Sequence, residues 1–338
     1  MLRKHKIIKN KKMETKNRNQ KSKYILFVII LLILLIGIAA SLKRPKVDDY
    51  NKFKEENLAI TSEDELAFIK ENIIKTSVPK DGIPPIDSPN YFTTVKEAEE
   101  SGEIVNEDIV FGVNYEGFIA AYPKDIMYWH EIVNEEINNK KISVTYCPLT
   151  ATIIGYKGLS LGVSGSLYNS NLVMYDRETQ GFIPQISGKF IDGEKRGEKL
   201  EAFKVDITSW VNWKSKYPNT KLLSRKTGSF RAYDNNPYPG YDSILQVWFP
   251  LVAESDELHR KEIVFGIEKN DNYVAIQKEG FKDKYPSGLE VEVGGETFKI
   301  TYNSQLEIIE TNKEVKSFEG YWFAWYAYHP ETELIKTK

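Results

Sequence analysis

Residues 142–152 read ISVTYCPLTAT, and residues 162–179 read GVSGSLYNSNLVMYDRET. In the first stretch apolar and polar side chains alternate up to Cys147, the only cysteine of the chain, which predicts a half-buried strand. Pro148 lacks a backbone N–H group and ends that strand, so the thiol is expected at a strand end. The second stretch carries a further β-type run, Leu172–Tyr175, between turn-forming Gly and Asn residues. Together these stretches predict β-structure with a thiol at its edge.

Four phrases recur along the chain with a nearly constant spacing. IVFGV at 109–113 recurs as IVFGI at 263–267, FIA at 118–120 as YVA at 273–275, VTY at 144–146 as ITY at 300–302, and YDRET at 175–179 as YHPET at 328–332. The separations lie between 153 and 156 residues, which predicts an internal duplication. We therefore expect two related β-rich units, at residues 103–258 and 259–338, packed into one body that is mainly β with a few helices (α+β).

The second unit differs from the first where chemistry is expected. Asn303 stands at the position of Cys147, and the pair His-Pro at 329–330 stands at the position of Asp176 and Arg177. The second unit therefore lacks the thiol, and we expect it to be structural.

One long helix is expected in the first unit. Pro123 suits the first turn of a helix that runs to about Asn138. One apolar stripe of this helix would hold Ile126, Trp129, His130, Val133 and Ile137. His130 is therefore expected to point inward.

The N-terminal segment has the pattern of a membrane anchor. Residues 1–23 contain ten Lys and Arg residues and are expected to form a basic cytoplasmic tail. Tyr24–Leu42 is uncharged and long enough to cross a bilayer core of about 30 Å, which predicts a transmembrane signal anchor with the rest of the chain outside the cytoplasm. A cleaved signal peptide is the alternative, because small residues occur at 37–40. Residues 43–102 are expected to form a tether, a helix and a Pro-rich strap.

The composition limits the classes of partner. The formal net charge is −2, which argues against nucleic acid as a partner. Hydrophobic residues make up 41% of the 338 positions, enough for a buried core in one large domain or two.

The two opening stretches also resemble a known family. VTYCPL at 144–149 and GVSGSLYNSNLVMYDRET at 162–179 are similar to phrases of the bacterial family catalogued as domain of unknown function 3179. The resemblance extends from about Ile83 to WFAWYAYHPET at 322–332. It implies a shared fold and a location outside the cytoplasm, and no assigned activity. The family phrase usually reads Cys-Pro-Leu-Cys; Thr150 replaces the second thiol here, so an intramolecular dithiol cycle is not expected.

The leading functional hypothesis is a thiol-centred site at Cys147. A lone thiol can form a mixed disulfide with a partner protein or small ligand, or serve as a soft-metal ligand. His130 would lower the pKa of the thiol, and Cys147, His130 and Met174 would together suit copper. The alternatives are a buried structural cysteine and a core histidine.

Polar residues of the second stretch are candidates for the same pocket. Asp176 and Arg177 are expected to orient it, with Arg177 able to bind an anionic group; the alternative is a structural ion pair. The remaining candidate pocket residues are Thr150, Tyr168, Asn169 and Asn171.

The second hypothesis is a non-catalytic binding module for a glycan or a protein at the cell surface. Its binding face would be aromatic and rich in turns, and would use Trp210, Trp213, Tyr238, Tyr241 and Trp248. The alternative is that these side chains pack in the core. The run Gly162–Gly165 matches neither a phosphate loop nor a nucleophile elbow, so neither class is predicted.

Overall fold

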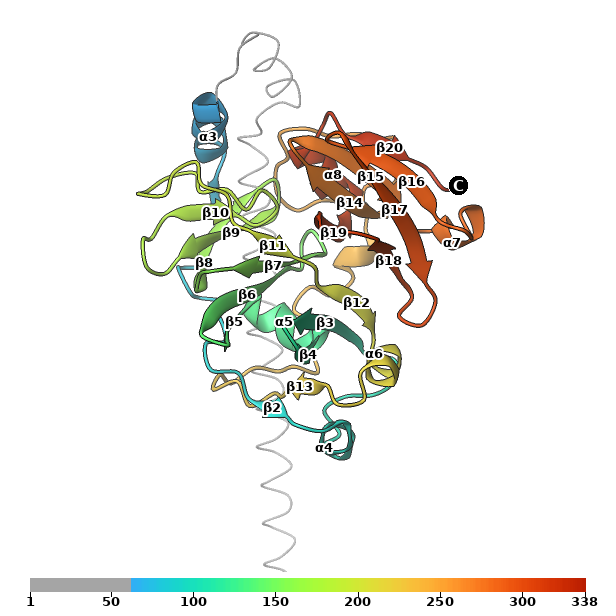
Figure 1. Cartoon of the computed structure of the whole chain (residues 1–338). Helices are drawn as coiled ribbons and strands as arrows, with labels where there is room; N and C mark the ends of the chain where they lie inside the picture. Colours follow the sequence, from blue (N-terminus) through green and yellow to red (C-terminus); the bar gives the residue numbers. More distant parts are fainter. Residues whose placement is uncertain (1–61) are drawn as a thin grey trace, which may run out of the picture. The chain divides into compact units, whose positions relative to one another are not determined.

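A computed structural model of the chain describes residues 62–338. Its strands form five small sheets, arranged as five blades in the manner of a β-propeller (Figure 1). Each sheet is named below by two of its adjacent strands. Most neighbouring strands are antiparallel and joined by tight turns, which suits short runs of β-branched and aromatic residues separated by Gly and Asn.

The β3–β4 sheet has the strand order β12-β3-β4-β13-β2. Its strands are β2 (Tyr91–Phe92), β3 (Ile109–Tyr115), β4 (Phe118–Pro123), β12 (Asp206–Ser209) and β13 (Lys221–Leu223). β3 pairs antiparallel with β4 and β12, and β13 runs parallel to β4. Helix α4 (Val95–Glu100) precedes β3, and helix α6 (Trp210–Lys216) connects β12 to β13.

The next two sheets follow β4 along the chain. The β6–β7 sheet, of order β11-β7-β6-β5, contains β5 (Ile132–Ile137), β6 (Lys140–Cys147), β7 (Thr152–Lys157) and β11 (Ala202–Phe203). The β8–β9 sheet, of order β1-β8-β9-β10, contains β1 (Ile74–Lys75), β8 (Leu161–Tyr168), β9 (Asn171–Asp176) and β10 (Phe182–Pro184). Helix α3 (Ser62–Glu71) precedes β1, and helix α5 (Lys124–His130) connects β4 to β5.

The C-terminal part holds the last two sheets. The β14–β15 sheet, of order β19-β14-β15-β20, contains β14 (Ile263–Lys269), β15 (Asn272–Gln277), β19 (Lys316–Tyr321) and β20 (Glu333–Ile335). The β16–β17 sheet contains β16 (Leu289–Val293), β17 (Glu296–Asn303) and β18 (Ile308–Thr311). Helix α7 (Phe281–Lys284) connects β15 to β16, and helix α8 (Trp322–Tyr328) connects β19 to β20. The short 3-10 helix η1 (Tyr241–Ser243) lies between β13 and β14.

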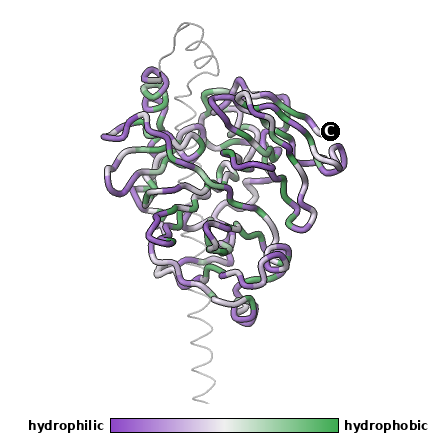
Figure 2. Tube along the Cα trace, in the orientation of Figure 1, coloured by the Kyte–Doolittle hydropathy of each residue, from purple (hydrophilic) through white to green (hydrophobic). Residues whose placement is uncertain are grey.

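Two of the hydrophobic cores are shared between pairs of sheets. One lies between the β3–β4 and β6–β7 sheets and includes Phe111, Tyr122 and Val144. Another lies between the β14–β15 and β16–β17 sheets and includes Phe265, Phe298 and Ile300. Figure 2 shows the corresponding hydrophobic positions along the strands, with hydrophilic residues in the loops that join them. Burial of these apolar side chains is the main stabilising contribution to the body.

The prediction of two related β units is wrong, because the strands divide among five sheets. The described part of the chain also gives no support to the predicted transmembrane helix. Within residues 62–338, no helix is both long and apolar enough to cross a membrane. The predicted anchor Tyr24–Leu42, the basic tail 1–23 and the first part of the tether lie outside the described residues.

Repetition occurs at the level of single sheets. The phrases at 109–113 and 263–267 lie in β3 and β14, those at 118–120 and 273–275 in β4 and β15, and those at 144–146 and 300–302 in β6 and β17. The fourth predicted pair is not equivalent, because 175–179 follows β9 whereas 328–332 follows α8. The structural counterpart of WFAWYAYHPET at 322–332 is WVNWKSKYPNT at 210–220, since α8 and α6 follow the equivalent strands β19 and β12.

The helix predicted to run from Pro123 to about Asn138 ends early. α5 stops at His130, because Glu131 adopts a left-handed conformation with φ of 57°. The chain then continues as β5, whose first residues, Ile132 and Val133, are β-branched. This change of direction places Glu131 between a helix and a strand.

Candidate thiol site

Cys147 is the last residue of β6 and pairs with Thr152 of β7. Its side chain is 1% exposed, and its Sγ lies 3.9 Å from the carbonyl oxygen of Ser170. The thiol is free. The turn from Pro148 to Ala151 then carries the chain toward the β14–β15 sheet, where the Tyr321 N–H donates to the carbonyl oxygen of Thr150. Cys147 therefore lies at a junction between sheets.

The hairpin between β8 and β9 covers one side of the thiol. Asn169 and Ser170 both have positive φ, as a two-residue hairpin turn requires. The Asn169 side chain donates to the carbonyl oxygen of Ala327, and the Ser170 hydroxyl donates to that of Phe249. The turn is therefore fixed by residues far away in the sequence.

A buried hydrogen-bond network lies next to this hairpin. The Asn171 amide donates to the Thr150 hydroxyl at 3.0 Å and to the Gln185 side chain at 2.8 Å. The Thr152 hydroxyl donates to Gln185 at 2.7 Å, and Gln185 donates to the backbone carbonyl of Thr145. Such a saturated network fixes a unique arrangement of the strands that it joins. Asn171 and Gln185 thus hold the wall of the site, while the backbone N–H of Thr150 donates to the carbonyl oxygen of Cys147.

Glu131 is the acidic group beside the thiol, and sequence reasoning missed it. It is 6% exposed, and its carboxylate accepts a hydrogen bond of 3.4 Å from the Tyr238 hydroxyl. Burial raises the pKa of Glu131 to about 8, although the Tyr238 hydrogen bond opposes the shift. Burial, and then the charge of Glu131, raise the pKa of Cys147 to about 11; hydrogen bonding to Thr150 opposes this. The only signal in the sequence is that Glu131 directly follows His130.

A long connection covers the other side of the thiol. We call residues 224–262, between β13 and β14, the covering segment; η1 is its only helix or strand. Tyr238 packs against Tyr128 with ring centroids 6.0 Å apart, and Tyr241 packs against Trp248 at 4.6 Å. Burial, then the charge of Glu131 and then that of Cys147 raise the pKa of Tyr238, whereas burial and then the charge of Cys147 raise the pKa of Tyr241.

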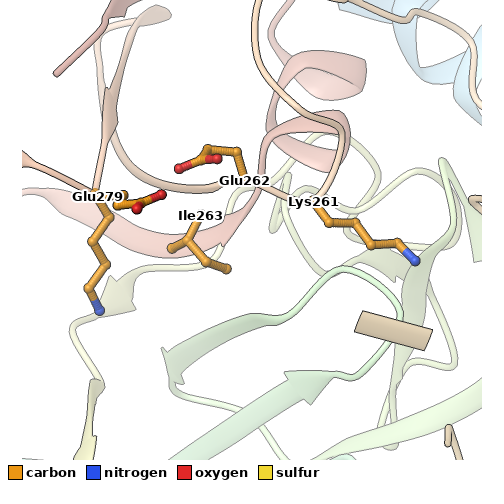
Figure 3. A pocket seen from close by; sticks show the side chains of 5 residues that line it. Lys261, Glu262, Ile263 and Glu279 are labelled. Atoms are coloured by element: carbon orange, nitrogen blue, oxygen red, sulfur yellow. The ribbon is translucent and has the colours of Figure 1, made fainter. Parts of the chain in front are cut away.

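Lys261 anchors the end of the covering segment. It is 7% exposed, its Nζ donates to the carbonyl oxygen of Tyr241, and the same nitrogen lies 3.5 Å from the centroid of the Tyr241 ring. Lys261 also borders an open hollow of about 460 Å³, shared with Glu262, Ile263, Lys278 and Glu279. Figure 3 shows the Lys261 side chain extending away from Glu279. Burial lowers the pKa of Lys261 to about 8, and the charge of Asp242 opposes this shift.

His130 and Met174, the residues predicted to bind a metal together with Cys147, each have other partners. His130 is buried, with Nδ1 2.7 Å from the carbonyl oxygen of Pro84 and Nε2 2.7 Å from the Tyr233 hydroxyl, so both nitrogens are engaged away from the thiol. Burial lowers the pKa of His130, while its hydrogen bond to Pro84 opposes that shift. Met174 is buried in β9 opposite Ile183. In residues 62–338, no group of three or more His, Cys, Asp and Glu residues could hold a metal ion.

Asp176 and Arg177 fasten the turn after β9. Asp176 is buried, accepts a hydrogen bond from the Thr179 hydroxyl and lies 3.3 Å from Lys195. Burial opposes ionisation of Asp176, but these hydrogen bonds outweigh it and hold its pKa below the usual value. Arg177 pairs with Asp87 of the strap at 2.9 Å. The two side chains therefore join the β8–β9 sheet to its neighbours.

The remaining aromatic candidates fall into two groups. Trp210 and Trp213 are completely buried in the core beside β3, so they are not available to stack on a sugar. Tyr168 packs edge-on against Tyr328 with centroids 5.3 Å apart, next to the hairpin turn. Tyr238, Tyr241 and Trp248 belong to the covering segment, so the aromatic stretch and the thiol form one region.

Comparison with known proteins identifies the family of the chain. No curated protein and no solved structure matches the chain. The model of the family described as "Protein of unknown function (DUF3179)" matches residues 80–317, which is more than half of the sequence and includes Cys147, Glu131 and the covering segment. The chain therefore belongs to the DUF3179 family.

Proposed function

We propose that this protein carries out thiol–disulfide exchange, with Cys147 as the reacting group and Glu131 as the acceptor of its proton. The observation that carries the proposal is that the buried Glu131 accepts, through its backbone carbonyl, from the N–H of Tyr146, the residue directly before the only cysteine of the chain. A carboxyl group whose pKa is about 8 is ionised in about a tenth of the molecules at pH 7 and in half of them at pH 8, and this ionised form can accept the thiol proton as a general base.

The exchange step balances without a further oxidant. The Cys147 proton passes to Glu131, and the resulting thiolate attacks one sulfur of a disulfide substrate. The substrate S–S bond breaks as a new S–S bond forms to Cys147, and the departing thiolate takes up the proton from Glu131. The chain has no second cysteine, so a thiol of another molecule must release the bound half.

The test uses the full chain and glutathione disulfide as the probe. Intact mass should show one bound glutathione per chain under native conditions and none for Cys147→Ser. Glu131→Gln has nearly the same shape and cannot accept the proton at neutral pH, so exchange should slow by about 10²-fold or more. Exchange that occurs only at the rate of global unfolding would show that Cys147 is a core residue and would overturn the proposal.

The second candidate is partner binding by the covering segment. Phe230 is 94% exposed, Leu245 is 66% exposed and Ile244 is also exposed, although large apolar side chains are normally buried. These side chains favour a protein partner over a glycan. The double variant Phe230→Ala and Leu245→Ala should abolish binding of such a partner while leaving glutathione exchange at Cys147 unchanged. The opposite pattern would exclude this candidate.

A further inference from the structure

The closed position of the covering segment buries a cationic group that has no carboxylate partner. Lys261 is more than nine-tenths buried, and its Nζ contacts a backbone carbonyl and the Tyr241 ring. In the described part of the chain no ion pair joins Lys261 to a carboxylate. A buried ammonium group without a carboxylate loses hydration that a carbonyl and a ring replace only in part.

The charged groups around Lys261 are engaged elsewhere or face away from it. Lys278 pairs with Glu319, Arg260 with Glu254, and Glu262 accepts a hydrogen bond from Gln277. His259 Nδ1 accepts from the backbone N–H of Lys261, and Glu279 pairs with Lys338. Asp242, on η1, is the carboxylate whose charge acts on Lys261.

The covering segment is tied to the body by single hydrogen bonds, such as those of Phe249 with Ser170 and of Val252 with Asn169, rather than by strand ladders. Apart from η1, it contributes no helix or strand over 39 residues (224–262), so it lacks the ladder hydrogen bonds that hold the neighbouring sheets. The Tyr241 hydroxyl is buried without a well-formed hydrogen bond, which also weakens the closed arrangement. Segments of this kind open locally at a lower free energy than global unfolding.

We propose that Lys261 is a positioning residue of the thiol site: burial of its unpaired ammonium group weakens the closed position of the covering segment, so that the segment opens and exposes Cys147 while that group is charged. This inference rests on the proposed thiol function and supplies the route by which a substrate reaches the buried sulfur. Tyr241 is the link, because it contacts Lys261 on one side and packs against Trp248 on the other. The next residue, Phe249, accepts a hydrogen bond from the Ser170 hydroxyl, and the Ser170 carbonyl oxygen lies 3.9 Å from Cys147 Sγ.

The direction of the pH dependence follows from the lowered pKa of Lys261. In the closed state this pKa is about 8, whereas an exposed lysine titrates near 10.5. The proton is therefore held more tightly when the segment is open. The contribution of the charged Lys261 to the free energy of opening is fully present below pH 8 and is lost as the pH rises from 8 toward about 10.5.

The experiment measures alkylation of Cys147 by iodoacetamide in the native full chain, followed by intact mass. Lys261→Met keeps the aliphatic stem and removes the charge, so alkylation at pH 7 should be about tenfold slower than in the wild type. The ratio of the wild-type rate to the Lys261→Met rate should fall as the pH rises from 7 to 9.5, because Lys261 of the wild type loses its charge over this range. The thiolate fraction of Cys147 affects both rates and therefore cancels in the ratio. Lys261→Arg, which stays charged, should react at least as fast as the wild type with no such fall.

The matched control is Lys282→Met. Lys282 of α7 is exposed and lies 5.3 Å from the Tyr302 ring of β17, so its loss should leave alkylation unchanged. Thermal unfolding shows whether each variant is folded. Equal or faster alkylation of Lys261→Met at pH 7 would overturn the inference. A wild type that alkylates in the predicted pattern but forms no glutathione adduct would leave the opening in place and overturn the exchange function instead.

Discussion

The β3–β4 and β14–β15 sheets share one connectivity, yet only the first leads to a thiol. In each sheet a helix follows an edge strand, α6 after β12 and α8 after β19, and a further strand then pairs parallel with β4 or β15. The next long strand along the chain from each pair ends at Cys147 in β6 and at Asn303 in β17. The corresponding strand ends therefore carry a thiol in β6 and an amide in β17.

The shared part of the two sheets is a contact between a glycine and a tryptophan. Gly112 of β3 lies against Trp213 of α6, and Gly266 of β14 lies against Trp325 of α8. The two indole N–H groups donate to Thr220 and Thr332, each at 2.9 Å. This packing requires a residue without a side chain on the strand.

The difference lies in the side chains at the strand ends. The Asn303 side chain accepts hydrogen bonds from the N–H groups of Gln305 and Leu306 and so stabilises a turn. Cys147 cannot do this, and its neighbours are instead the Glu131 carboxyl group and the covering segment. The comparison teaches that the repeated framework is preserved by packing, whereas chemistry depends on a few side chains outside it.

The largest effect is expected where the two sheets differ in buried charge. Glu268 of β14 is buried and pairs with Lys316 at 2.6 Å and with Lys199, whereas the equivalent Asn114 of β3 is exposed. Lys316→Met should lower the free energy of unfolding by about 3 kcal/mol, because it leaves a buried carboxylate partly uncompensated. Urea denaturation measures this loss.

The control for that measurement is Lys313→Met. Lys313 pairs with Glu296 at the surface, so its loss should cost less than about 1 kcal/mol. Similar losses of unfolding free energy in Lys316→Met and Lys313→Met would show that the buried ion pair contributes no more to stability than the surface pair.

Substitution of the two equivalent glycines, Gly112 and Gly266, should lower the stability by similar amounts. A Cβ added at Gly112 would lie 2.2 Å from a Trp213 ring carbon, and one added at Gly266 would lie 1.9 Å from Trp325. Gly112→Ala and Gly266→Ala should therefore each destabilise the protein by about 2–3 kcal/mol through overpacking. Thermal or urea unfolding tests both. A tolerated alanine at one site only would mean that the two sheets pack differently.

The pH dependence of stability should come in part from Glu131, which lies on the thiol side. Its pKa in the folded chain is about 8, above the usual value of 4.5, so the native state holds a proton that the unfolded chain releases. Stability should therefore fall as the pH rises from about 4.5 to 8, and Glu131 should account for part of that fall. Glu131→Gln should remove that part of the decline in urea titrations at pH 5 and pH 8.

Glu135 provides the internal check on this prediction. Burial raises its pKa to about 8 as well, and the hydroxyls of Tyr91 and Tyr122 hydrogen-bond to it. The single variant should thus retain some decline, and Glu131→Gln combined with Glu135→Gln should flatten it further. An unchanged slope in the double variant would contradict both assignments.

The smallest effect is expected at the two threonines that accept from the indoles. Thr220→Val and Thr332→Val keep the shape but leave a buried or half-buried N–H group unpaired, at a cost of about 1–2 kcal/mol each. A cost at Thr220 well above that at Thr332 would reflect its deeper burial. Differential scanning calorimetry can resolve such a difference.

Local sequence patterns predicted single strands better than their assembly. The alternation before Pro148 placed Cys147 at a strand end, and the run Leu172–Tyr175 lies within β9. Division into five sheets was missed because it depends on pairings such as β12 with β3, which join residues almost 100 positions apart. No local pattern records such a pairing.

The site was predicted only in part for the same reason. Glu131 reaches the thiol through a left-handed residue in the middle of an apparent helical stripe, which periodicity cannot detect. Tyr241 and Lys261 reach it from more than 90 residues away. Sequence reasoning named Cys147 and the nearby Thr150, Asn169 and Asn171, but neither Glu131 nor Lys261.

The fixed turn at Asn169 and Ser170 has a consequence for biosynthesis. Its hydrogen bonds end on Phe249 and Ala327, so the hairpin that lies against Cys147 reaches its final position only after nearly the whole chain has been made. Contacts of such sequence separation form late in folding. The order of synthesis therefore delays the fixing of this hairpin over Cys147 until the last strands of the chain are made.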